Sequence, residues 1–280
     1  MVGELTWVRR LVGLWLPLAA LFVFALFPFA WMAATSLKAN AELYDPKSNP
    51  LWIQHPSLVH YIGLIKESNF LVWIGNTMLV ALVATLISLL FGVMLAYPLA
   101  RMRFPASGLL ALSVGVAYLV PQTLLFVPMA DLINRMRLGD SLSAVMLTYP
   151  TLLVPFCAWL LIGYFKTVPK ELEEAARLDG CNTFGVFWHV MLPLSKPALT
   201  TVALFAFIGH WNDFMGPLIY TQSMEKKTLA LGLAAFKGLN GTEYHLMMAA
   251  SVAVLLPIIV IFFLAQRYFV QSIVSSGVKG

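Results

Sequence analysis

The stretch ELEEAARLDGCNTFGVFWHVMLP, residues 171–193, is the longest charged and amphipathic segment in a chain that is otherwise nearly all apolar. Its first nine residues hold four acids: Glu171, Glu173, Glu174 and Asp179. Elsewhere, runs of 25 to 31 residues carry no charge at all. Because ionised side chains are costly inside lipid, this segment must face water, where it is suited to binding a water-soluble partner.

The first half of this stretch has the pattern of a short helix. Pro169 suits the first turn of a helix, where its missing N–H costs nothing. The acids at positions 171, 173 and 174 then lie where the helix dipole favours negative charge, and residues 175–178 are good helix formers. Gly180 fits the left-handed position that closes a helix, so the chain is predicted to turn there.

The second half has the pattern of another short helix. Asn182 or Thr183 can cap its first turn. Its apolar residues recur at intervals of three and four, which places them in one stripe along a helix: Phe184, Phe187, Trp188 and Met191. Pro193 is expected to end this helix. The stretch is therefore predicted to form two helices joined by a bend.

Composition indicates an integral membrane protein. Of the 280 residues, 60% are hydrophobic and 11% are charged, and the mean hydropathy is +0.83. A soluble domain carries about 25% charged residues, so little of the chain is left for one. The net charge of +5 does not indicate nucleic acid binding, because the cations lie singly at the ends of apolar runs, where they act as topology signals.

The apolar runs predict six membrane spans, since about 20 residues cross a bilayer core. A single membrane domain, residues 1–280, is expected, with spans near 11–35, 71–100, 106–130, 141–165, 197–220 and 246–267 and a loop at 168–195. Pro121 and Pro128 should kink the third span. The small residues Gly92, Ala96 and Ala100 should let the second span approach a neighbouring helix closely. A short helix is expected near 57–66, in a segment that is either a plain connector or a docking surface.

The polar stretch resembles the EAA loop of ABC-importer permeases. Their pattern is Glu-Ala-Ala, three residues, Gly, nine residues, Ile, one residue, Leu-Pro. Here it is matched by Glu174-Ala175-Ala176, Gly180, Val190 and Leu192-Pro193, with Val for Ile as the one departure. The pair Asp179-Gly180, the stretch at 211–214 (WNDF) and the C-terminal residues 266–270 and 278–280 are similar to the carbohydrate-uptake branch, in particular to the smaller permease of maltose-type importers.

The resemblance implies an all-α permease domain of the type I ABC importer kind, with six spans and a cytoplasmic coupling helix. It implies import of a sugar, polyol or glycerol phosphate ester, with a second permease, an ATPase dimer that binds ATP and Mg, and an external solute-binding protein as partners. The expected location is the bacterial or archaeal inner membrane, with both termini in the cytoplasm, as Arg9 and Arg10 also suggest. The residues expected to couple to the ATPase are Glu173, Glu174, Ala175, Ala176, Asp179, Gly180, Leu192 and Pro193.

Polar residues within the apolar runs are candidates for the solute path. Asp213 is ionisable near membrane depth, which by default suggests function, and it lies next to Trp211 and Asn212. It could instead lie at the outer interface, cap a broken helix or pair with His210. Asn76 and Gln122 are further candidates, because amides both donate to and accept from sugar hydroxyls, although each could equally bond between helices.

Two other classes of function remain open at this point. The chain lacks the GxxxxGK[ST] phosphate loop, so it cannot itself be the ATPase. No HExxH or GxSxG motif indicates catalysis or a metal site. A six-span intramembrane protease would need a linked nucleophile and base, and Ser88, Ser113 and His210 are joined by no motif. A self-sufficient carrier is less natural without an internal repeat.

Overall fold

The computed structural model describes residues 10–49, 51–238 and 241–277. Arg9 and the C-terminal residues 278–280 therefore lie outside the described residues. Contacts group the chain into two compact units, one of residues 1–70 with 233–256 and the other of residues 71–232 with 257–280. The described chain is nearly all helical, as predicted, and its strands β1 (Lys237–Gly238) and β2 (Gly241–Thr242) form a two-residue antiparallel pair.

The first unit combines one membrane helix with a folded segment that follows it. After η1 (Leu11–Trp15), helix α2 (Leu16–Leu37) exposes apolar side chains along most of its length. Helix α3 (Asn40–Leu43) and helix α4 (Val59–Lys66) come next, and α4 confirms the short helix expected near 57–66. The long helix α15 (Tyr244–Gly277) begins in this unit.

Buried charges hold the segment between α2 and α4 in a fixed shape. The Glu42 carboxylate accepts hydrogen bonds from the backbone N–H groups of Gln54 and His55, both at 3.0 Å. The Gln54 bond is the main reason that the pKa of Glu42 is below its usual range. The Lys38 ammonium lies 3.8 Å from the same carboxylate and donates to the Asn49 carbonyl. The segment is therefore a folded unit with its own buried polar contacts.

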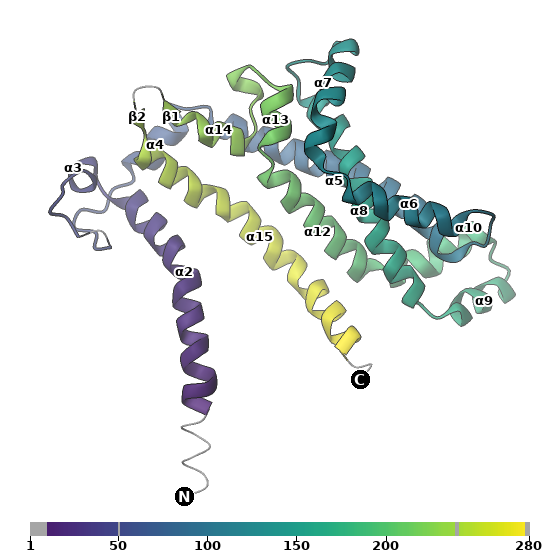
Figure 1. Ribbon diagram of the computed structural model, residues 1–280. Helices are drawn as coiled ribbons and strands as arrows, with labels where there is room; N and C mark the ends of the chain where they lie inside the picture. The colour runs from purple at the N-terminus through teal and green to yellow at the C-terminus, as the bar shows by residue number, and fades with distance from the viewer. Residues whose placement is uncertain (1–9, 50, 239–240, 278–280) are drawn as a thin grey trace, which may run out of the picture. The chain divides into compact units, whose positions relative to one another are not determined.

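The second unit contains the remaining spans. Its helices are α5 (Phe70–Arg101), α6 (Ser107–Leu119), η2 (Gln122–Leu125), α7 (Phe126–Arg135), α8 (Leu142–Thr167), α9 (Lys170–Leu178), α10 (Thr183–Val186), η3 (Phe187–Met191), α11 (Leu192–Leu194), α12 (Lys196–Asn212), α13 (Met215–Tyr220), η4 (Met224–Lys226) and α14 (Leu229–Ala235). Both α6 and α12 pack against α8 (Figure 1). The core joins apolar residues of α5, α8, η3 and α12, with Ala96, Cys157, Phe165, Met191 and Ala206 fully buried.

Four described helices are long and apolar enough to span a membrane, and there are up to six spans if each of two bent pairs counts as one. The expected third span bends by 93° between α6 and residues 123–135. The predicted kink at Pro121 is therefore confirmed, because this residue opens the short turn η2. The other bent pair turns by 73° at Ser195, where the polar stretch meets α12. The expected fifth span ends early, at Asn212, and resumes as α13.

The close approach predicted from Gly92 is confirmed. A Cβ atom at Gly92 would lie 2.6 Å from the Cys157 Cβ and 3.3 Å from the Ala158 backbone nitrogen, both in α8. Real Cβ atoms are not found so close to one another, so only glycine allows this contact. Gly75 lies in the same helix, and a Cβ there would meet no atom within 4 Å.

We expect Gly92→Ala to destabilise the protein by about 1–3 kcal/mol, because α5 and α8 must move apart. Gly75→Ala is the matched control and should stabilise α5 by about 0.5–1 kcal/mol, since alanine is the better helix former. Thermal unfolding midpoints of the two purified variants in detergent test this difference. Equal midpoints would show that the approach of α5 to α8 is not limited by residue 92.

Candidate functional site

The polar stretch folds as the two helices that its sequence predicts. Helix α9 ends at Leu178, and Gly180 follows two residues later with a φ of +91°, in the left-handed region. The Cys181 N–H then bonds to the Ala176 carbonyl and closes the helix. The Asn182 side chain caps α10 by accepting from the Gly185 N–H at 2.7 Å. The second helix runs on to Leu194, one residue beyond the predicted end at Pro193, because the Ser195 N–H still bonds back to Met191.

A buried ion pair fastens this loop to α5. Arg101, the last residue of α5, places its Nε 2.5 Å from Oε1 of Glu173 in α9, and the two side chains are only 4% and 7% exposed. The Arg101 guanidinium also donates to the Val168 carbonyl at 2.6 Å. From one turn further along α9, Arg177 approaches the other oxygen of Glu173 at 3.7 Å. The start of α9 is therefore held against the end of α5.

The same end of α5 also contacts the second helix of the loop. Tyr97, one turn before Arg101, lies with its ring 4.9 Å from that of Phe187 in η3 and 6.1 Å from that of Phe165 in α8. Met191 is fully buried in the same core. The Tyr164 hydroxyl donates to the Leu194 carbonyl at 2.9 Å and fixes the exit of the loop. Both loop helices are therefore held in place by contacts with the membrane helices α5 and α8.

The side of the loop that faces away from α5 is exposed. Among the predicted coupling residues, Glu173 and Ala176 face inward and Leu192 is half-buried, whereas the others are exposed: Glu174, Ala175, Asp179, Gly180 and Pro193. Leu178 is 90% exposed, and the exposed rings of Phe184 and Trp188 stack on each other with centroids 6.3 Å apart. The loop therefore presents acidic and large apolar side chains together.

Arg101→Met should destabilise the protein by about 3 kcal/mol, because it leaves Glu173 buried without its main partner. Adding Glu173→Gln should recover part of the loss, since no unpaired charge is then buried. Arg103→Met is the control, because Arg103 is exposed. Thermal unfolding in detergent gives all three values. If Arg101→Met unfolds at the same temperature as Arg103→Met, the ion pair does not hold the loop.

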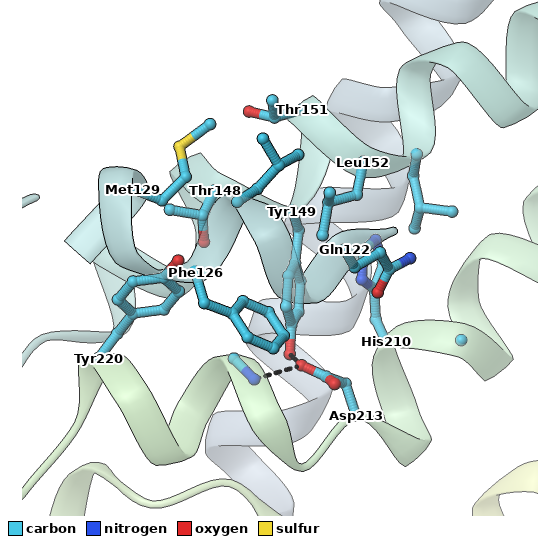
Figure 2. A pocket seen from close by; sticks show the side chains of 14 residues that line it. Gln122, Phe126, Met129, Thr148, Tyr149, Thr151, Leu152, His210, Asp213 and Tyr220 are labelled. Carbon is cyan, nitrogen blue, oxygen red and sulfur yellow. Dashed lines mark hydrogen bonds between the residues drawn. The ribbon is translucent and has the colours of Figure 1, made fainter. Parts of the chain in front are cut away.

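A pocket with about 650 Å³ of empty space, part of it open to solvent, lies where the broken spans meet. Its polar side chains come from η2, α8 and the α12–α13 junction (Figure 2): Gln122, Thr148, Tyr149, Thr151, His210 and Asp213. Phe126, Met129 and Tyr220 add apolar and aromatic surface. Small-molecule sites show this mixture of apolar walls and few polar groups.

Asp213 organises the pocket wall. Its Oδ2 accepts a hydrogen bond from the Tyr149 hydroxyl at 2.7 Å and from the Gly216 N–H at 3.0 Å (Figure 2). Its Oδ1 accepts from the Met215 N–H at 3.3 Å. Of the alternatives that the sequence left open, Asp213 therefore caps a broken helix. The His210 ring stacks on that of Tyr149, with centroids 4.3 Å apart.

Of the other candidates for the solute path, Gln122 also lines this pocket, whereas Asn76, Trp211 and Asn212 do not. Asn76 donates to the carbonyls of Glu225 and Lys227 at 2.7 and 2.9 Å, which fixes the loop before α14 on α5. Asn212 donates to the Ile208 carbonyl within its own helix. Trp211 is buried, 2% exposed, and stacks on Phe207. Sequence reasoning missed Tyr149, because nothing in its neighbourhood marks it as the partner of a carboxylate 64 positions later.

The carboxylate of Asp140 links the loop before α8 to the loop after α13. Asp140 accepts hydrogen bonds from the Ser223 hydroxyl and from the backbone N–H groups of Gln222 and Ser223, the latter two at 2.8 and 2.9 Å. These bonds, the hydroxyl bond above all, lower the pKa of Asp140 to about 2. The stabilisation from these hydrogen bonds is therefore fully present at pH values above the ordinary aspartate pKa of about 3.9, and it is lost only as the pH falls toward 2.

Comparison with known proteins identifies the family. Residues 88–275 match the model of the family described as binding-protein-dependent transport system inner membrane component. The chain belongs to this family. It is 32% identical over 260 residues to the arabinooligosaccharides transport system permease protein AraQ of Halalkalibacterium halodurans, covering 91% of this chain and 92% of the relative. It is 30% identical over 262 residues to the sulfoquinovosyl glycerol transport system permease protein SmoH of Agrobacterium fabrum, covering 93% and 91%.

The fold of this permease also matches a solved structure. A chain of a bacterial ABC transporter involved in the import of the acidic polysaccharide alginate superposes with a TM-score of 0.81, at 23% identity, over 94% of this chain and 98% of the other. The permease therefore has the type I ABC importer fold, and it is a multi-pass inner-membrane transport subunit rather than an enzyme. The intramembrane protease and the self-sufficient carrier are both set aside by this membership.

Proposed function

We propose that this permease forms half of the path of an ATP-driven sugar importer and that residues 168–195 couple it to the ATPase. In this proposal the chain is one permease domain, residues 1–280, that pairs with a second permease, an ATPase dimer that binds ATP and Mg, and an external solute-binding protein. The cargoes that the names of the two relatives give, arabinooligosaccharides and sulfoquinovosyl glycerol, support a sugar or sugar-derived cargo. The loop and both termini then lie in the cytoplasm.

The proposal rests on the difference between the two sides of the loop, one packed against a membrane helix and the other exposed. Its inner side is fastened to α5 through Arg101 and Tyr97. Its outer side exposes the apolar side chains of Leu178, Phe184 and Trp188 and also the carboxylate of Glu174. Exposed apolar groups with adjacent charges are typical of protein interfaces. A push on this surface by an ATPase would pass directly into a membrane span.

Glu174→Lys should lower ATP hydrolysis stimulated by the solute-binding protein about tenfold or more, which corresponds to a loss of roughly 1.4 kcal/mol of docking free energy. Its exposed carboxylate is available to a cationic side chain of the ATPase, and a lysine would repel that cation. The complex is purified through a tag on this chain and reconstituted in lipid, and hydrolysis is measured with and without binding protein and sugar.

Glu171→Lys is the matched control, because Glu171 is an exposed acid of the same helix, three residues away. It should keep most of the stimulated activity. Normal stimulation in a well-inserted Glu174→Lys variant would contradict the role of the loop. A chain that purifies without any ATPase would contradict the importer proposal as a whole.

A further inference from the structure

The pocket at the breaks of the two spans has a charge that selects among sugar cargoes. We infer that it receives an uncharged glycosyl unit and excludes anionic sugars, an inference that rests on the importer function proposed above. The relatives and the solved structure described above leave this choice open, because their names include the acidic polysaccharide alginate and sulfoquinovosyl glycerol as well as arabinooligosaccharides.

The first argument is the state of the helix end at the α12–α13 break. Backbone N–H groups at such a break are the natural partners of an anionic solute in a membrane protein. Here the N–H groups of Met215 and Gly216 already bond to the carboxylate of Asp213. A Cβ at Gly216 would lie 2.7 Å from Oδ2 of Asp213, so glycine is what lets this carboxylate approach. The permease therefore supplies its own anion at this break, and these two N–H groups are not free to bind an anionic solute.

The second argument is the charge of the lining. No lysine or arginine lines the pocket in the part of the chain that the structure describes. His210 is the one lining side chain that can carry a positive charge, and Asp213 bonds to the same Tyr149 on which His210 stacks. The lining is therefore either neutral or negative, whichever form His210 takes. An anionic sugar entering it would lose its hydration without gaining a cationic partner.

The third argument is that polar groups of the pocket can still make further hydrogen bonds. The Nε2 of His210 is buried and has no hydrogen-bond partner among the described residues, although the residue is only 4% exposed. Asp213 Oδ1 holds a single long bond and can accept another from a hydroxyl. The Gln122 amide also lines the pocket (Figure 2) and offers donors and an acceptor. Hydroxyl groups both donate and accept, so an uncharged sugar suits these groups together.

The test compares two trisaccharide probes, maltotriose and the triply charged trigalacturonate. The complex containing the full chain is placed in nanodiscs without the binding protein, so that the selectivity of that protein does not enter, and sugar binding is followed by saturation-transfer NMR at millimolar concentrations. We expect maltotriose to bind at least tenfold more tightly than trigalacturonate. Equal binding, a preference for trigalacturonate, or no binding of either sugar would overturn the inference.

Two variants test whether the preference for the uncharged sugar arises in the pocket. Asp213→Asn keeps the shape and the capping oxygen of the side chain but removes its charge, and it should reduce the preference to about threefold. Gln122→Lys adds a cation and should strengthen trigalacturonate binding severalfold. Asp131→Asn is the control, because this exposed carboxylate on α7 pairs with Arg135 away from the pocket. If both pocket variants behave like Asp131→Asn, the selectivity arises elsewhere and the inference fails.

ATP hydrolysis stimulated by the binding protein is measured on the same preparations. If stimulation is present and is lost in Glu174→Lys while the sugar preference is absent, the importer function stands and only the inference about the pocket is wrong. If the complex with the natural sequence shows no stimulated hydrolysis, the proposed function itself fails.

Discussion

A peptide group that faces hydrocarbon has no water to bond with, and each unsatisfied N–H or C=O costs several kcal/mol. The long helices α5 and α8 meet this constraint through their internal hydrogen bonds. Where the chain leaves regular helix near a span, local groups replace the missing bonds. The Asp213 carboxylate, for example, accepts hydrogen bonds from the N–H groups at the start of α13.

These local hydrogen bonds explain where a span of the permease can be broken and where a pocket can form. A broken span is stable only where protein or a water-filled cavity covers the break, and the pocket lies where the α6–α7 and α12–α13 breaks come together. In the function proposed above, the polar groups that make the breaks possible are also the groups that would meet a solute. Asp213 shows both roles, since the carboxylate that caps α13 also sets the charge of the pocket wall.

The sequence predicted the local structure of the loop well and its long-range contacts not at all. Gly180 and Asn182 act on their own backbone within three or four residues, so residue type and spacing were enough to predict the turn and the cap. Glu173 and Glu174 are neighbours with the same chemistry, yet one is buried and the other exposed. What separates them is Arg101, a residue of another helix, and no local pattern joins the two.

The spans show the same limit. Pro121 predicted a kink, because a proline removes a helical hydrogen bond, but a bend of 93° depends on packing against α8 and α13, which no short pattern encodes. Asn76 and Asp213 were both candidates for the solute path, since an amide and a carboxylate within an apolar run both suggest a polar function inside the membrane. Only the structure separates the amide that holds a loop from the carboxylate that lines the pocket.

The ion pair between Arg101 and Glu173 also has a consequence for the order of events at the ribosome. The two residues are 72 positions apart in the sequence, 173 minus 101. At about 5–20 residues per second, α5 is complete several seconds before the carboxylate that its last residue needs has been made. During that interval the guanidinium must be solvated by lipid headgroups or water. The loop gains its base only after α8 has been synthesised, so a partner that recognises the folded loop selects chains whose first spans are already in place.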